Sequence, residues 1–382
     1  MQAVQQFLQQ VINGVQTGSV YALIAVGYTM VYGVLKFINF AHGDVYMVGA
    51  YIGFFTVTGY LVHADPAAQG IAALMICMVG CASLGALIER LAYRPLRNGL
   101  SVREAVPWAI FWSLYGGLFG FRIAQHIIGA TLMGGKALPP VEIGFIVAAG
   151  ITFAAAVPLL KLLFGALSKH VKPSPSRLTA LITAIGISLL LENQGQAIFT
   201  ANPRAYQIKG VDRPWQLSFI GVHLTVSSGR MVVLVAAVIL TVVLVYTVRF
   251  TSVGRAIRAV SFDPDAAALM GIPTDRLIAT TFIIGSALAG AAGFLNHGLT
   301  RINFDANVGI ALGLKAFVAA VLGGIGSIEG AVLGGLLMGL AESFTAGSSF
   351  STFKDAIAFV VLIIVLLVKP AGLMGRDVPE KV

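Results

Sequence analysis

The chain has 382 residues, of which 57% are hydrophobic and only 11% are charged, and its formal net charge is +9. Soluble domains carry about 25% charged residues, so this chain has too little polar surface to cover a water-exposed globule. A charge of +9 could indicate nucleic-acid binding, but the basic residues lie in short clusters between long uncharged runs, the pattern of cytoplasmic loops in a membrane protein. No basic residue precedes Lys36, so no cleavable signal peptide is predicted.

Long apolar runs follow one another along the whole chain, and a helix that crosses a bilayer needs roughly 20 mostly apolar residues. In chain order, the predicted spans are 10–34, 44–62, 70–89, 106–121, 142–165, 178–199, 231–248, 277–298, 308–324, 329–346 and 354–368. The first two, and likewise 308–324 with 329–346, could contain a half-helix or a re-entrant segment. The sequence therefore predicts an all-α, polytopic bundle of about 9 to 11 spans with broken or re-entrant helices.

Four basic clusters set the expected orientation, because cytoplasmic loops are enriched in Lys and Arg. Their members are Arg90, Arg94, Arg97 and Arg103; Lys169, Lys172 and Arg177; Arg249, Arg255, Arg258 and Arg276; and Lys369, Arg376 and Lys381. All four fall on one side of the membrane if the N-terminus lies outside. The loop 200–230 then also lies outside, although it is basic.

The strongest polar cluster is Asn39-Phe40-Ala41-His42-Gly43-Asp44, which interrupts two apolar runs. Polar groups at membrane depth are costly and are candidates for a transport path or gate. The alternative is a turn at the cytoplasmic surface, with His42 and Asp44 in water. Further candidates for the path are Glu192, Asn296 and Glu342, each of which could equally be an inter-helix contact.

A long basic loop, 247–282, contains a predicted short amphipathic helix between Asp263 and Ile272. Asp-Pro is a typical helix start, and Gly271 with Pro273 a typical stop. Such a helix could dock on a cytoplasmic partner or lie on anionic lipid.

Several kinds of site have no matching pattern. The chain has no phosphate-binding Gly-rich loop and no nucleophile or zinc motif, so neither enzyme activity nor a cofactor is predicted, and any ATP must be bound by a partner. The alternatives from other functional classes are a membrane enzyme that uses His42 and Asp44 as an acid–base pair, and an autonomous secondary transporter. Cys77 and Cys81 lie on one face of a predicted helix as packing residues.

Several strings resemble the branched-chain amino acid permease family, the smaller of the two permease subunits in the high-affinity import system. They are residues 12–51, 93–97 (YRPLR), 177–193, the loop 249–276 and 316–342. The resemblance implies one permease domain over 1–382 in a bacterial inner membrane. It also implies a second related permease, two cytoplasmic ATPases and a periplasmic binding protein as partners. Import of urea, short amides or another amino acid is the alternative, and the sequence leaves open whether the permease pairs with itself.

Two features follow from this resemblance. In such importers a Glu-Ala-Ala-x-x-x-Gly pattern couples the permease to the ATPase, and here Asp265, Ala266, Ala267 and Gly271 match it with Asp in place of Glu. In the family, YRPLR leads almost directly to the string at 177–193. The intervening residues, about 100–175, are therefore expected to be an inserted hairpin of two spans.

Overall fold

The computed structural model describes residues 2–94, 177–199, 202–208, 210–211, 213–219 and 222–375. Residues 1–89 and 180–382 form one compact unit, and residues 90–179 form another. The predicted spans 106–121 and 142–165, and with them the expected inserted hairpin, lie outside the described residues.

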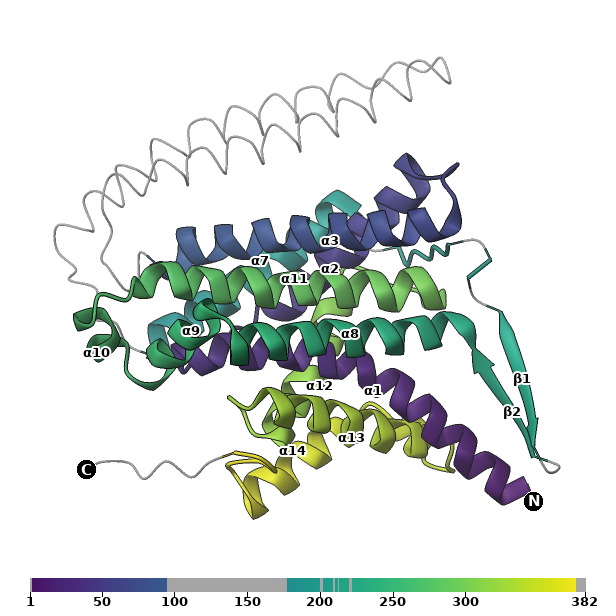
Figure 1. The fold of residues 1–382 in the computed structure, drawn as a ribbon. Helices are drawn as coiled ribbons and strands as arrows, with labels where there is room; N and C mark the ends of the chain where they lie inside the picture. The colour runs from purple at the N-terminus through teal and green to yellow at the C-terminus, as the bar shows by residue number, and fades with distance from the viewer. Residues whose placement is uncertain are drawn as a thin grey trace, which may run out of the picture. The chain divides into compact units, whose positions relative to one another are not determined.

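The larger unit is a bundle of helices (Figure 1). The α-helices are α1 (Gln2–Leu35), α2 (His42–Phe55), α3 (Pro66–Ile88), α7 (Arg177–Phe199), α8 (Ser228–Phe250), α9 (Ser252–Phe262), α10 (Pro264–Leu269), α11 (Thr274–Thr300), α12 (Val308–Gly323), α13 (Ile328–Ala346) and α14 (Ile357–Val368). Short helical turns occur at Thr56–Tyr60, Glu89–Tyr93 and Ser351–Phe353. Every predicted span within the described residues coincides with one of these helices, which confirms the polytopic helical fold.

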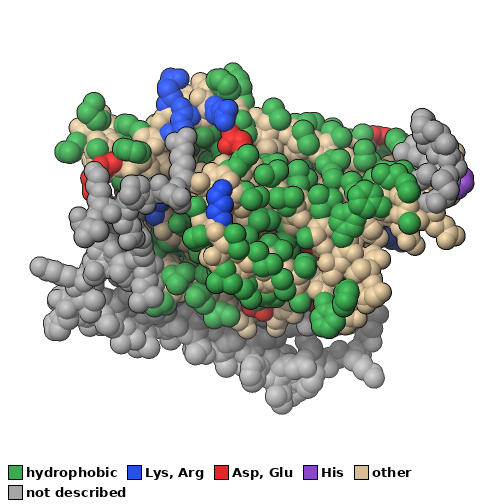
Figure 2. Space-filling view, turned by 90° about the horizontal axis from the view of Figure 1, so that it is seen from below, with side chains coloured by type: hydrophobic (Ala, Val, Ile, Leu, Met, Phe, Trp, Pro, Cys, Tyr) green, Lys and Arg blue, Asp and Glu red, His purple; other side chains and the backbone are tan. Residues whose placement is uncertain are grey.

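Among the described residues, five helices are long and apolar enough to cross a membrane: α1, α3, α8, α11 and α13, with α3 continuing to Tyr93. Helices α12 and α14 are apolar but shorter. Figure 2 shows that hydrophobic side chains cover much of the face on the α13–α14 side, while charged side chains gather toward the end that carries α9 and α10. On α8, the outward side chains include Val235, Ile239 and Val242, each more than half exposed. An apolar surface of this kind suits contact with lipid.

A two-stranded antiparallel hairpin, β1 (Pro214–Phe219) and β2 (Val222–Ser227), stands at the end of the bundle opposite α9 and α10 (Figure 1). The N-terminal turns of α1 hold it. Gln5 Nε2 donates to the His223 carbonyl at 2.7 Å, and Gln9 both donates to the Thr225 carbonyl and accepts from the Thr225 N–H, each at 2.9 Å. The expectation of a purely helical chain missed this hairpin.

Helices α1 to α3 and α11 to α13 follow the same plan. In each, a long helix ends at a residue with positive φ, at Lys36 (φ 57°) and at Arg301 (φ 58°), and a short non-helical segment leads into a shorter helix. The first segment contains Ile-Asn-Phe at 38–40 and the second at 302–304. The long helices run in opposite directions in Figure 1. The two halves therefore form an inverted repeat, a common plan in transporters.

The two halves interlock, because α1 packs on α13 and α11 packs on α3. Glycine allows the first contact. A Cβ built at Gly18 would lie 2.8 Å from the Leu336 Cα, and one at Gly339 would lie 2.3 Å from the Gly18 nitrogen. The backbones of α1 and α13 thus touch directly, the packing that small residues permit between membrane helices.

We expect Gly18→Ala to destabilise the protein by about 1–3 kcal/mol, since the added methyl group has no room against α13. Gly33→Ala is the matched control on the same helix, because its Cβ would meet nothing closer than 3.9 Å. The midpoint of thermal unfolding in detergent would fall for the first variant only. Equal midpoints would show that α1 and α13 are not in such close contact.

Candidate functional site

The polar cluster after α1 lies inside the bundle. Asn39 is 3% exposed, and His42 and Asp44 are each 1% exposed. The His42 ring lies against the backbone of Gly27, eight residues before the end of α1, and edge-on to the Tyr28 ring with centroids 4.6 Å apart. The chain thus turns back after Leu35, and α2 begins part-way along α1. This burial rules out the solvated surface turn and leaves the role in a path or gate as a prediction.

The first turns of α2 and α12 meet at this level. A Cβ on Gly43 would lie 2.3 Å from the Gly309 carbonyl oxygen and 2.9 Å from the Gly313 Cα. From this contact α2 runs toward the hairpin end, where Phe54 lies near Tyr206. Helix α12 runs toward the end where Glu329 of α13 pairs with Arg249 of α8. We call this meeting point, with Gly43, Asp44 and Gly309, the half-helix junction.

Helix α7 covers one side of the half-helix junction. Ser188 Oγ donates to Asp44 Oδ2 at 2.5 Å. Glu192 lies one turn further along α7, on the same side of the helix as Ser188. One more turn along, Gln196 Nε2 donates to Asn307 Oδ1 at 2.8 Å, next to the start of α12. The polar residues of α7 therefore form a stripe at every fourth residue that faces the junction.

A second buried network joins α2 to the last turns of α11. His297 Nδ1 lies 2.9 Å from the Ile302 carbonyl, which can only accept, so this nitrogen carries a proton. His297 Nε2 then accepts from the Tyr46 hydroxyl at 2.8 Å, and that hydroxyl accepts from Asn296 Nδ2 at 2.8 Å. Asn296, predicted for the path, is thus part of a satisfied hydrogen-bond chain that fixes α2 on α11.

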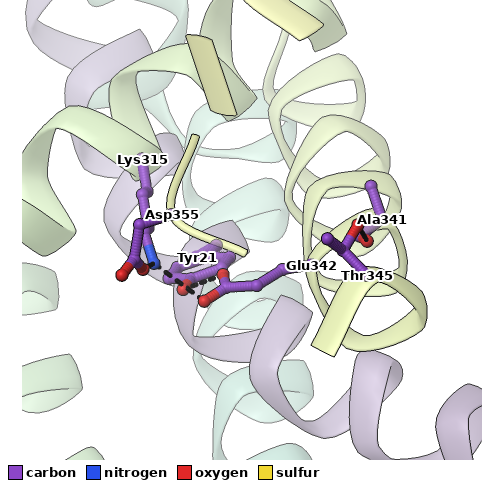
Figure 3. A network of polar contacts seen from close by, with 6 residues as sticks. All are labelled: Tyr21, Lys315, Ala341, Glu342, Thr345 and Asp355. Atoms are coloured by element: carbon purple, nitrogen blue, oxygen red, sulfur yellow. Dashed lines mark hydrogen bonds and ion pairs between the residues drawn. The ribbon is translucent and has the colours of Figure 1, made fainter. Parts of the chain in front are cut away.

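Glu342 belongs to a third cluster, shown in Figure 3, which joins four segments of the chain. Tyr21 of α1 donates to Glu342 Oε2 at 2.5 Å, and Lys315 of α12 donates to Glu342 Oε1 at 2.7 Å. Lys315 also donates to Asp355, between α13 and α14, at 2.6 Å. This ammonium lowers the pKa of the Asp355 carboxyl, which lies outside the spanning helices, from its ordinary value. The cluster ties α12 to α1 and α13.

The structure thus brings together five of the seven residues predicted for the path, namely Asn39, His42, Gly43, Asp44 and Glu192. Asn296 and Glu342 lie in two other clusters. Sequence reasoning missed Ser188 and Asn307 at the half-helix junction. The spacing of Ser188, Glu192 and Gln196 along one helix face was a signal that could have found the first of them.

The predicted coupling residues lie in and directly after α10, which follows α9 at one end of the bundle (Figure 1). Asp263 caps α10 by accepting from the N–H groups of Asp265 and Ala266, and Gly271 ends it with φ 79°. Both the start and the stop of the short helix are therefore as the sequence predicts. Three large apolar side chains project from this segment: Phe262, Leu269 and Met270, at 94%, 89% and 82% exposure.

Within the described residues, no three His, Cys, Asp or Glu side chains are placed to hold a metal ion together. Cys77 and Cys81 are buried and unpaired, with their thiols directed at the carbonyls of Gly49 and Val45. They pack α3 against α2, as the sequence predicts.

Removing Lys315 should destabilise the bundle, because Glu342 and Asp355 would lose their common cation. We expect Lys315→Met to lower the free energy of unfolding by about 1.5–3 kcal/mol, the usual range for a charged hydrogen bond. Lys354→Met, one residue before Asp355, is the control. Thermal unfolding of the two variants in detergent compares them, and an equal loss in both would contradict a specific role for the cluster.

Comparison with known proteins gives matches over the whole chain. The profile of a family described as "Branched-chain amino acid transport system / permease component" matches residues 10–131 and 119–366. The high-affinity branched-chain amino acid transport system permease protein LivH of Escherichia coli (strain K12) is 34% identical over 387 aligned residues, covering 98% of both chains. The corresponding permease protein BraD of Pseudomonas aeruginosa is 33% identical over 386 residues, covering 100% of both.

A probable LivH of Methanocaldococcus jannaschii is 31% identical over 134 residues, 33% of this chain and 42% of the relative. No solved structure matches the chain. The apolar helices and these relatives make the chain a multi-pass protein of the inner membrane. With a family profile that spans most of the sequence and two relatives aligned over nearly their whole length, the chain belongs to the permease components of branched-chain amino acid transport systems.

Proposed function

We propose that this chain is a pore-forming permease subunit of an ATP-driven importer, and that its substrates are branched-chain amino acids. The observation that carries the proposal is the buried half-helix junction in a chain whose full-length relatives are named as permeases of such amino acids. Polar groups at a broken helix offer partners for both charges of an amino acid. The absence of a nucleotide-binding loop in the sequence assigns ATP to partner subunits.

The path or gate is formed by Asn39, His42, Gly43, Asp44, Glu192, Asn296 and Glu342. The first five surround the half-helix junction. Asn296 and Glu342 hold the neighbouring helices through the two other clusters, so they act on the path through helix position. Transport proceeds by alternating access, in which the two inverted halves rearrange around the junction.

Coupling to the ATPases occurs at α9 and α10. The start, the close packing and the sharp exit of the short helix come from Asp265, Ala266, Ala267 and Gly271. An apolar surface at the basic end of the bundle is formed by Phe262, Leu269 and Met270. Exposed apolar side chains rimmed by charge are typical of a protein interface. This end is cytoplasmic, with the N-terminus outside, so a binding protein would approach the hairpin end. A second permease subunit completes the assembly.

The proposal is tested by uptake into proteoliposomes that contain this chain with its partner permease, ATPases and binding protein. We expect labelled leucine, isoleucine or valine to accumulate only when the ATPases can reach ATP. Accumulation of urea or an amide instead would show that the transported substrate is not a branched-chain amino acid. Uptake that persists without the ATPases would contradict the ATP-driven mechanism.

The coupling surface has its own test. Leu269→Arg should weaken ATPase binding about fivefold or more, because the loss of an important apolar contact at an interface costs over about 1 kcal/mol. Leu269 is a better choice than Gly271, whose positive φ makes any substitution there disturb the turn.

Phe350→Arg is the control for that variant, since Phe350 is 67% exposed and follows α13 in another part of the chain. Binding of the purified ATPase to both variants, measured by biolayer interferometry, compares them. Equal binding would place the coupling contact elsewhere.

A further inference from the structure

One oxygen of the Asp44 carboxylate, Oδ1, lacks a hydrogen-bond donor among the described residues. The other oxygen, Oδ2, accepts from Ser188, whereas Oδ1 is buried, and the side chain as a whole is 1% exposed. Oδ1 points at the first turn of α12, 2.8 Å from where a Cβ of Gly309 would lie. A buried acceptor without a donor costs free energy unless a ligand completes it.

No cation in the described part of the chain balances this carboxylate. Among the described residues, those near it are Tyr28 of α1 and Ser188 and Glu192 of α7. Glu192 adds a second negative charge. None of the ion pairs between described residues includes Asp44. An unpaired carboxylate is expensive away from water, so this position calls for a proton or a cation.

The helix geometry favours the ionised carboxylate of Asp44 over the protonated acid. The N-terminal turns of both α2 and α12 lie at Asp44, and the positive ends of helix dipoles stabilise the ionised form of a carboxylate. The transported amino acid would bring one positive group, its α-ammonium. That group has three N–H donors, which is enough to donate to both carboxylate oxygens of Asp44.

Helix α7 closes this position, and its described contacts with the bundle are of a separable kind. They include the hydrogen bonds of Ser188 and Gln196, the packing of Gly195 on Met47 and Ala306, and the ring contacts of Phe199 with Tyr51 and Phe55, at centroid distances of 4.0 and 5.5 Å. On the opposite face of α7, Ile182, Ile185 and Leu189 are exposed. The glycine contact between α1 and α13, by comparison, leaves no room for sliding.

We propose that Asp44 is the binding site for the α-ammonium group of the transported amino acid, and that α7 is the movable wall that covers it. This inference rests on the proposed function and adds the contact residue and the moving element. When α7 moves away, the Ser188 hydroxyl leaves Oδ2 and the ammonium takes its place, bridging both carboxylate oxygens. The structure described here is the closed state of that site.

The site is tested by binding of leucine to the purified complex without the binding protein, read as the rise in unfolding temperature at millimolar ligand. Asp44→Asn keeps the shape of the side chain and removes its charge, and we expect it to weaken leucine binding about 10- to 100-fold. Asp355→Asn is the same change in the Lys315 cluster, and leucine should raise its unfolding temperature as much as it raises that of the unchanged chain. The probe 4-methylpentanoate has the carboxylate and side chain of leucine but no amine, and should shift neither protein.

The movable wall is tested by a disulfide. A Cβ at position 195 would lie 3.4 Å from the Ala306 Cβ, close to the separation in disulfides, so the pair Gly195→Cys and Ala306→Cys should crosslink on oxidation. We expect uptake by the oxidised protein to fall about tenfold or more and to recover when dithiothreitol is added. The reduced form of the same protein is the control.

The outcomes separate this inference from the proposed function. If leucine is imported, and Asp44→Asn binds leucine as tightly as the unchanged chain, the ammonium site is wrong while the proposed function stands. Full uptake by the oxidised pair overturns the role of α7 in the same way. If the unchanged chain neither imports nor binds any branched-chain amino acid, the proposed function itself fails.

Discussion

Direct contact between helix backbones at glycine is the constraint on which the rest of this bundle depends. Lipid is as apolar as the side chains, so burial of apolar surface does not drive membrane helices together, and short-range packing must do so. Glycine removes the side chains that would keep two backbones apart. The contacts of Gly18 with α13, and of Gly43 with Gly309 and Gly313, therefore fix the distances between the helices. The half-helix junction exists because the second of these contacts brings two helix starts together.

The polar clusters divide into two kinds with different consequences. The Tyr46–Asn296–His297 chain and the Lys315–Glu342 cluster have well-matched donors and acceptors, and they hold elements at fixed positions. At the half-helix junction Asp44 lacks a full set of partners and lies under a helix attached mainly by side-chain contacts. A site that binds a substrate transiently needs rigid surroundings and an unsatisfied polar group that can be covered, because the substrate must be both bound and released.

The sequence predicts what is local and misses what depends on distant pairing. Apolar runs located the helices, and Asp263, Gly271 and Pro273 located the ends of α10. The cluster at 39–44 was found because polar groups interrupt apolar runs. The partners could not be found, since Ser188 and Asp44 are 144 positions apart and Tyr21 and Glu342 are 321 apart. The inverted repeat became visible only in the structure, where the shared tripeptide at 38–40 and 302–304 occupies the same place in each half. The hairpin is held by two glutamines of α1, and no local sequence pattern predicts this contact.

The packing of α1 on α13 has a consequence for biosynthesis. A ribosome releases α1 first, but the helix that completes its glycine contact is made on the order of 300 residues later, which takes roughly 15 to 60 s at the usual rate of elongation. During that interval α1 must remain in the bilayer with its small-residue face, including Gly14 and Gly18, turned to lipid or to a chaperone. The native bundle can close only after α13 has been inserted. Nascent chains interrupted before α13 therefore lack the native partner for that face and expose a surface that the finished chain buries.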